Sequence, residues 1–311
     1  MQSKLHWLFG TTVLCACASD ASDAAQLPEE ATPLAAETCG EVDRSAIWKP
    51  EKGATWDLQL IGPVNTSTNV DVVDIDAETS SKELIASLHR AGKKVICYVN
   101  AGAWEPYRRD SKKFPAEVLG KAWSATKYAD EKWLDIRRID VLGPLMEARF
   151  DMAKEKGCDA IDADNVDGFD DAGSGADRTG FNLTHDDQLR FNRYIACAAH
   201  ERGLAIGLKN NPSQADDLVA DFDFVVSEQC FDYNECKRYQ PFLTADKPVF
   251  LVEYQEDLSP NAEAKFSTMC TQADQLGISA ILKNDELDAW RVACPSGGAA
   301  VPTERTTPRA R

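Results

Sequence analysis

The sequence has none of the short patterns that mark nucleotide or metal binding. No Gly-x-Gly-x-x-Gly or P-loop motif follows an apolar segment, which counts against a nucleotide-binding fold. The four histidines are scattered and no Cys-x-x-Cys pair occurs, so we predict neither a metal site nor a cofactor. No histidine ends an apolar segment, so a Ser/His/Asp triad is not indicated either.

Basic residues are scarce relative to acidic ones. The chain has 34 Lys and Arg against 51 Asp and Glu, which gives a formal net charge of -17. Proteins that bind nucleic acid carry basic patches, so nucleic acid is excluded as a partner. The acidic balance can serve solubility alone, or it can attract a polycationic substrate.

Long hydrophobic runs are also missing. Trp7–Ala16 is largely apolar but much shorter than the ~20 residues that a membrane-spanning helix needs, and no later segment qualifies. With Lys4 before it and Leu14–Cys17 at its end, this run resembles a bacterial signal peptide with a lipobox. Residues 1–17 are therefore a predicted signal peptide, and Cys17 is the predicted lipid carrier. The alternative is a secretory signal cut near Ala16–Ala25.

Either signal predicts export, with the protein lipid-anchored to a bacterial outer membrane or cell surface, or otherwise secreted. A lipid anchor would be its one membrane contact. Residues 18–38 are rich in Ala, Asp, Glu and Pro and are predicted to be a disordered linker. Residues 295–311 are predicted to be a disordered tail. The folded part is expected to be one domain over 39–294, and a monomer.

Eight of the ten cysteines follow the leader, and an even number in an exported chain indicates disulfides. A bond between Cys39 and Cys294 would join the two ends of the domain, and one between Cys230 and Cys236 would close a small loop. Cys97 and Cys158 adjoin apolar segments, where a buried free thiol is an equal alternative.

Short apolar segments alternate with amphipathic ones along the domain. Eight are predicted to be buried strands, and they cover Trp56–Ile61, Val70–Ile75, Lys94–Val99, Cys158–Ala163, Leu204–Leu208, Phe222–Glu228, Val249–Glu253 and Ile278–Leu282. Predicted helices run from Ser81 to Gly92, from Pro144 to Gly157, over Asp186–Arg202 and over Asn261–Leu276. Eight strand–helix repeats predict an α/β fold of the (β/α)8 TIM-barrel type, and a doubly wound open sheet is the alternative.

Carboxylates and amides gather where these strands end, which is where barrel enzymes place their catalytic groups. Hydrolysis of a glycosidic bond needs two carboxyl groups, one as acid and one as nucleophile or base. Asp162 and Asp164 point the same way because side chains on a strand alternate, and Glu228 could face them across the barrel mouth. The aspartate cluster does not fit a calcium-binding EF-hand loop, although a structural cation in Asp170–Asp177 stays an alternative.

A long segment, Asn100–Ile139, follows the third strand and carries an aromatic cluster. Its members are Trp104, Tyr107, Trp123, Tyr128 and Trp133. Above a barrel mouth these rings could stack on sugars, or they could anchor the loop by packing. Their clustering favours a carbohydrate groove.

Six segments of the domain resemble glycoside hydrolase family 114. They are Trp56–Leu60, Trp133–Arg137, Asp162–Gly168, Ile206–Asn210, Ser227–Cys236 and Pro248–Tyr254. The resemblance covers Trp48–Trp290, in family order. It implies a TIM-barrel endo-α-1,4-polygalactosaminidase that acts on galactosamine-containing exopolysaccharides, often partly deacetylated and therefore cationic.

The resemblance also implies a catalytic Asp after the fourth strand and a catalytic Glu after the sixth. These fall on Asp164, or its neighbour Asp162, and on Glu228. Further expected substrate contacts are Asp167, Asn210, Glu253, Tyr98 and Gln59. For Gln59 and Tyr98, a satisfied polar group inside the barrel is an equal alternative. Competing functions are hydrolysis of another hexosamine glycan and non-catalytic carbohydrate binding by a surface lipoprotein.

Overall fold

The structure is a computed structural model that describes residues 42–169 and 178–295, all within one compact unit. The predicted leader with Cys17, the linker 18–38, Cys39 and the tail beyond Pro295 lie outside the described residues and stay predictions. No helix within the described part of the chain is long and apolar enough to cross a membrane.

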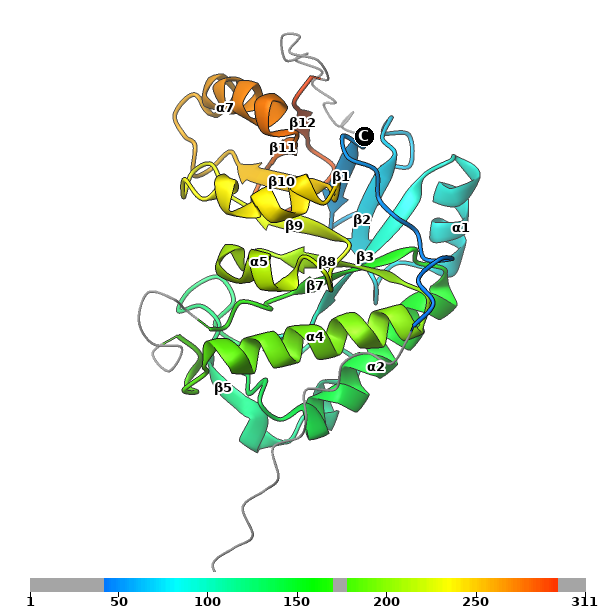
Figure 1. Cartoon of the computed structure of the whole chain (residues 1–311), viewed down its shortest axis with the longest axis vertical. Helices are drawn as coiled ribbons and strands as arrows, with labels where there is room; N and C mark the ends of the chain where they lie inside the picture. Colours follow the sequence, from blue (N-terminus) through cyan, green and yellow to red (C-terminus); the bar gives the residue numbers. More distant parts are fainter. Residues whose placement is uncertain (1–41, 170–177, 296–311) are drawn as a thin grey trace, which may run out of the picture. The chain divides into compact units, whose positions relative to one another are not determined.

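A curved sheet of eight parallel strands in chain order forms the centre of the domain (Figure 1). Its strands are β1 (Trp56–Gln59), β2 (Val72–Asp76), β3 (Lys94–Asn100), β7 (Ala160–Asp164), β8 (Ala205–Lys209), β9 (Phe224–Glu228), β10 (Val249–Tyr254) and β11 (Ser279–Lys283). Each predicted strand is present. A short strand, β12 (Val292–Ala293), adds antiparallel to β11.

The two outer strands of this sheet, β1 and β11, come back together. The indole Nε1 of Trp56 donates to the carbonyl of Ser279 at 2.8 Å, and the amide of Leu60 donates to the carbonyl of Leu287 at 2.9 Å. Strands that follow chain order around a curve and then meet make a TIM-barrel-like fold, as predicted. The doubly wound alternative is wrong, because its strand order would reverse at a switch point.

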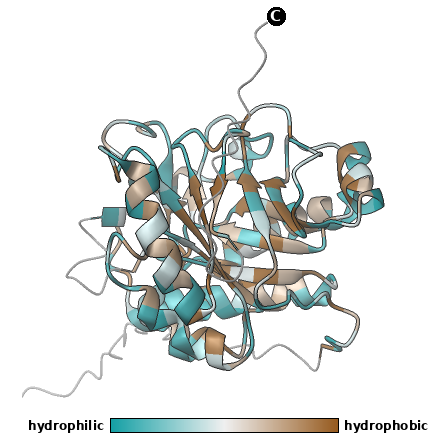
Figure 2. Ribbon diagram, turned by 90° about the horizontal axis from the view of Figure 1, so that it is seen from above, coloured by the Kyte–Doolittle hydropathy of each residue, from teal (hydrophilic) through white to brown (hydrophobic). Residues whose placement is uncertain are grey.

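Helices cover the outside of the sheet (Figure 1). They are α1 (Lys82–Arg90), α2 (Ile139–Lys156), α4 (His185–Glu201), α5 (Ala215–Leu218), α6 (Gln240–Thr244) and α7 (Ala262–Leu276), with the 3-10 turns η1 (Ser111–Lys113), η2 (Ala116–Val118), η3 (Pro212–Gln214) and η4 (Cys236–Tyr239). The link from β1 to β2 contains no helix. Figure 2 shows hydrophobic residues on the central strands and hydrophilic residues on the outward helix faces.

Several helix ends follow local sequence signals. Ser81 caps α1 by accepting from the amide of Leu84, and Gly157 ends α2 with a left-handed φ of 98°. However, α2 begins at Ile139 and not at Pro144. Proline sits in the second turn of α2, where it removes one intrahelical donor without ending the helix.

Alternate side chains of each strand face two different cores. Residues such as Val72, Ile96 and Phe224 fill the barrel interior, whereas their neighbours Val73 and Val225 pack outward under the helices. This alternation is the period of two that a strand imposes. It decides which polar residues at the strand ends can point into the barrel mouth.

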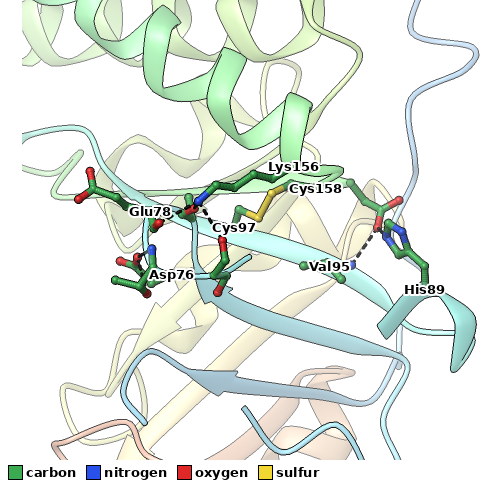
Figure 3. Close-up of a disulfide and its surroundings, with 11 residues drawn as sticks. Asp76, Glu78, His89, Val95, Cys97, Lys156 and Cys158 are labelled. Carbon is green, nitrogen blue, oxygen red and sulfur yellow. Dashed lines mark hydrogen bonds and ion pairs between the residues drawn. A yellow bond between two sulfur atoms is a disulfide. The ribbon is translucent and has the colours of Figure 1, made fainter. Parts of the chain in front are cut away.

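Three disulfides join described residues. Cys97 forms a disulfide with Cys158 and links β3 to the turn before β7 (Figure 3). The alternative of buried free thiols is therefore wrong. The predicted bond between Cys230 and Cys236 is present. Cys197 is disulfide-bonded as well.

The predicted bond between Cys39 and Cys294 is wrong. Cys294 bonds Cys270 of α7, with the two Cα atoms 5.2 Å apart. The reason is that β12 runs antiparallel to β11, which brings Cys294 back toward α7, the helix that precedes β11. The nearest cysteine there is 24 residues away in sequence and not at the other end of the domain.

The long segment after β3 folds into a small sheet of its own, with the order β4 (Ala103–Trp104), β6 (Lys132–Leu134) and β5 (Leu119–Ala122). Trp133 is buried and Trp104 is half-buried, so these two rings anchor the segment. Three other rings, Tyr107, Trp123 and Tyr128, line a cleft at the barrel mouth. The anchoring role is therefore present, and stacking of the three cleft rings on sugars stays a prediction.

Candidate active site

A cleft of about 640 Å³ opens where the parallel strands end. Each strand residue that reaches the cleft lies an even number of positions from a residue that fills the barrel interior, so its side chain points inward. These residues are Asp76 of β2, Tyr98 of β3, Asp164 of β7, Lys209 of β8, Glu228 of β9 and Tyr254 of β10. The floor of the cleft is thus made of inward residues at or near the ends of successive strands, held by the sheet itself.

At this floor, three carboxylates surround one buried ammonium group. Lys209 Nζ lies 3.3 Å from Asp164 Oδ1, 3.4 Å from Asp162 Oδ2 and 3.8 Å from Glu228 Oε2. The nearest oxygens of Asp164 and Glu228 are therefore no more than about 7 Å apart. Burial lowers the pKa of Lys209 and the carboxylates raise it, with a net result well above its ordinary value.

Further donors fix the two outer carboxylates. Tyr98 donates its hydroxyl to Asp164 Oδ2 at 2.7 Å, and Asn165 donates to the same oxygen at 3.0 Å. Glu228 accepts from the hydroxyl of Tyr254 on one oxygen and from Asn210 at 3.2 Å on the other. The predicted contacts Tyr98 and Asn210 thus meet the cleft beside the acid pair.

Asp162 lies below the cleft and has no solvent-exposed surface. Burial, partly opposed by Lys209, raises its pKa from 3.8 to about 6. By contrast, the side chains of Asp164 and Glu228 are 18% and 27% exposed. Asp164 and Glu228 therefore have carboxylates that a ligand in the cleft could reach, whereas Asp162 does not.

The chain turns sharply just after Asp164, Lys209 and Glu228. Asn165, Asn210 and Gln229 have left-handed backbones, with φ of 60°, 51° and 59°. Gly102 lies so close to this turn that a Cβ atom there would be 1.6 Å from the carbonyl oxygen of Asn165. The amide of Gly102 also donates to the carbonyl of Asp164 at 3.1 Å. The end of β3 thereby fixes the backbone of Asp164.

The cleft is strongly acidic. Ten carboxylates among its described lining residues face four cationic side chains. The carboxylates belong to Asp76, Glu78, Glu105, Glu131, Asp164, Asp167, Glu228, Asp257, Asp285 and Glu286, and the cations to Arg108, Lys127, Arg178 and Lys209. A cationic ligand would enter this field favourably.

An ion and hydrogen-bond network occupies the side of the cleft formed by the segment after β3. Arg108 bonds Asp76 at 2.6 Å and Glu105 at 2.6 Å, and the hydroxyl of Tyr107 donates to both Glu105 and Glu131. Burial raises the pKa of Glu131 to about 7, with Tyr107 acting in the opposite direction. Tyr107 is 62% exposed, so its ring faces solvent at the edge of the cleft.

Two of the expected substrate contacts do not line the cleft. Gln59 and Glu253 have the outward parity of their strands and are buried. Gln59 bonds the carbonyls of Ile61 and Pro63, whereas Glu253 accepts from the amide of Phe231. Contrary to expectation, both side chains support loops. Burial raises the pKa of Glu253 to about 7.

Asp167 also lines the cleft, and its contact with a substrate stays a prediction. Its carboxylate lies 3.4 Å from Arg178 Nη2, and the guanidinium of Arg178 is held over the ring of Trp133. Burial raises the pKa of Asp167, and Arg178 opposes that shift. Asp167 therefore extends the acidic surface beyond the central pair.

Lys209, Tyr254 and Arg108 carry the site together with the predicted acids but were not among the expected site residues. Lys209 and Tyr254 directly follow predicted strands, and counting in twos from the interior residues Ala205 and Val252 would have found them. Arg108 lies in an irregular loop, where no periodic signal exists. Within the ranges that the structure describes, no group of three or more potential ligands is arranged to hold a metal ion, and Asp170–Asp177 lies outside them.

Comparison with known proteins agrees with this geometry. The sequence model of glycoside-hydrolase family GH114 matches residues 39–298. The crystal structure of Ega3 from Aspergillus fumigatus in complex with galactosamine is 36% identical, with a TM-score of 0.72, and the match covers 79% of this chain and 97% of that one. No match was found among curated proteins.

The glycoside hydrolase domain of PelA from Pseudomonas aeruginosa shares the fold at 12% identity, with a TM-score of 0.58 over 77% of this chain and 97% of that one. At that identity the likeness speaks for the fold alone. The family match spans most of the chain and includes every strand of the barrel. The chain therefore belongs to glycoside-hydrolase family GH114 and is a glycoside hydrolase.

Proposed function

We propose that this enzyme cleaves α-1,4-linked galactosamine-containing exopolysaccharide within the chain, with Asp164 and Glu228 as its catalytic pair. The observation that carries the proposal is the position of the two carboxylates around Lys209, at the floor of an acidic cleft. Two carboxyl groups on opposite sides of a glycosidic bond are the minimum chemistry for its hydrolysis.

The surroundings of the two residues suit different roles. Asp164 is the less exposed, lies closer to Lys209 and accepts two further hydrogen bonds on its other oxygen. These contacts fix the position of the carboxylate, as a nucleophile or base requires. Glu228 reaches farther into the cleft and lies farther from the ammonium group, which suits the acid that protonates the leaving oxygen.

The charge of the cleft supports a partly deacetylated, cationic polymer as the substrate. Free amino groups on the sugar would be attracted by the excess of carboxylates along the lining. The crystallised relative Ega3 binds galactosamine, which points to the same sugar. A cleft on the open face of the barrel, rather than a closed pocket, suits binding in the middle of a chain.

The test is the release of oligosaccharides from α-1,4-polygalactosamine, measured on preparations that differ only in their degree of acetylation. We expect the fastest release from the deacetylated polymer, with a KM that rises as salt is added because exposed charges are screened. The fully acetylated polymer, which has no ammonium groups, provides the control and should show little salt dependence. No release from any preparation would contradict the proposed substrate.

We also propose that the enzyme is exported. The three described disulfides support this, because such bonds form and persist outside a reducing cytosol. Lipid attachment at Cys17 rests on the sequence alone. Mass spectrometry of the mature amino-terminal peptide is expected to find Cys17 with acyl chains, and an unmodified end between Ala16 and Ala25 would contradict the anchor.

A further inference from the structure

Asp74 of β2 is a buried carboxyl group that the proposed chemistry does not use. It has no exposed surface, and neither of its side-chain oxygens has a hydrogen-bond partner. It points into the barrel interior, because it has the parity of Val72 and of Asp76, whose carboxylate lines the cleft. A buried polar group without partners costs free energy, so an ionised Asp74 would be strongly unfavourable.

Asp162 also has a buried side-chain oxygen without a hydrogen-bond partner. Its Oδ2 faces Lys209 at 3.4 Å, while its Oδ1 is buried and has no partner. Asp74 and Asp162 both point into the barrel interior and are both fully buried, and the pKa of Asp74 is raised by the neighbouring Asp162. Two carboxylates are acceptors only, so they can bond solely when one of them carries a proton. One shared proton would give partners to oxygens on both residues.

We infer that Asp74 is the protonated member of this pair and that its O–H group donates to Asp162, so that Asp162 is held in place to fix Lys209 beneath the catalytic carboxylates. Asp74 is thereby a positioning residue. It acts through Asp162 and Lys209, and touches neither Asp164 nor the sugar. The inference deepens the function proposed above and rests on it only where activity is the readout.

The charged groups around Asp74 explain which member of the pair holds the proton. Asp162 and Asp164 of β7 and Lys209 of β8 face it, and Lys209 lies directly against Asp162. Burial first, and then the charge of Asp162, raise the pKa of Asp74 well above its ordinary value, with Lys209 opposing both. Asp162 has the ammonium group as a direct partner and is therefore the better anion of the two.

Two substitutions of similar size separate this role from simple packing. Asp74→Asn keeps a neutral donor toward Asp162, so we expect kcat within about threefold of the wild type. Asp74→Leu removes the donor, and the freed Asp162 and Lys209 should lower kcat about 100-fold, as small misplacements do in active sites. Because Asp162 loses a hydrogen bond to its charged form, the acid limb of the pH profile should move to higher pH in the Leu variant only.

The second readout needs no substrate, and its main result comes from the wild type. Infrared spectra of the wild type at about pH 9 should retain the C=O band of a neutral carboxylic acid, since Glu131 and Glu253, with pKa values of about 7, are ionised there. Isotopic labelling of aspartate should shift that band. In Asp74→Asn the band should vanish.

Absence of the band in the wild type would overturn the inference, as would an Asn variant as inactive as the Leu variant. A band together with no cleavage of the polymer by the wild type would leave the buried acid pair standing and contradict only the proposed substrate.

Discussion

Glu228→Gln and Asp164→Asn are each expected to lower kcat on the galactosamine polymer by about 10³-fold or more, with little change in stability. Both replacements keep the shape and some hydrogen-bonding capacity of the side chain. Each removes the group that must either give a proton to the leaving oxygen or carry negative charge beside the anomeric carbon. The acid pair acts in the transition state, so kcat should fall much more than KM rises.

The two variants should also differ from each other. If Glu228 is the acid, Glu228→Gln should retain activity on substrates whose leaving group needs no proton, whereas Asp164→Asn should not recover on them. Activated aryl galactosaminides would provide such substrates. Recovery of the Asp164 variant alone would reverse the two roles proposed here.

Matched controls for these variants lie on the outer helices. Glu155→Gln on α2 and Asp274→Asn on α7 make the same chemical changes at exposed positions far from the cleft. Both should leave kcat unchanged. If they lost as much activity as the cleft variants, or if Glu228→Gln stayed fully active on the polymer, the assignment of the pair would be wrong.

Lys209→Met is expected to destabilise the protein by about 3–5 kcal/mol, because it leaves a group of buried carboxylates without their cation. Methionine has a similar length and fills the space that the lysine stem leaves. The loss is therefore electrostatic and not a matter of packing. Urea denaturation of both proteins measures it, and the exposed Lys265→Met on α7 gives the control, which should change stability very little.

The pH dependence of this loss has a definite sign. The folded-state pKa of Asp162 is about 6, above its ordinary value of 3.8, so its ionisation weakens the folded state as pH rises through that window. Lys209 opposes that shift, and its removal should raise the pKa of Asp162 further. The stability difference between Lys209→Met and the wild type should therefore be smaller at pH 5 than at pH 8. An equal or larger difference at pH 5 would contradict this account.

The strands of the fold could be predicted from sequence because each is a short apolar segment that ends at a polar residue. Pro144 misled the prediction of α2, because a proline is compatible with both the start and the second turn of a helix. Cys294 was assigned the wrong partner because spacing along the chain says nothing about where β12 returns. Distances in space decide disulfides, and the sequence does not contain them.

Acidic residues at strand ends could be recognised in the sequence as candidate site residues. The sequence analysis did not separate side chains that point into the barrel from those that point outward. Asp164 and Glu228 end their strands on the inner face, whereas Gln59 and Glu253 point outward although they also lie at strand ends. Counting in twos from the barrel-filling residues would have separated them. Asp74 could not have been identified in this way, because its significance lies in partners that it lacks.

The left-handed turns after the active-site strands restrict how this cleft can vary. At Asn165, Asn210 and Gln229 a β-branched side chain would cost about 1–2 kcal/mol from backbone geometry alone, before any contact is lost. Glycine, asparagine and aspartate adopt that conformation most readily. Mutagenesis toward new sugars should therefore avoid β-branched residues at these three positions. A library of cleft variants should keep positions 165, 210 and 229 unchanged and diversify the segment between β3 and β7.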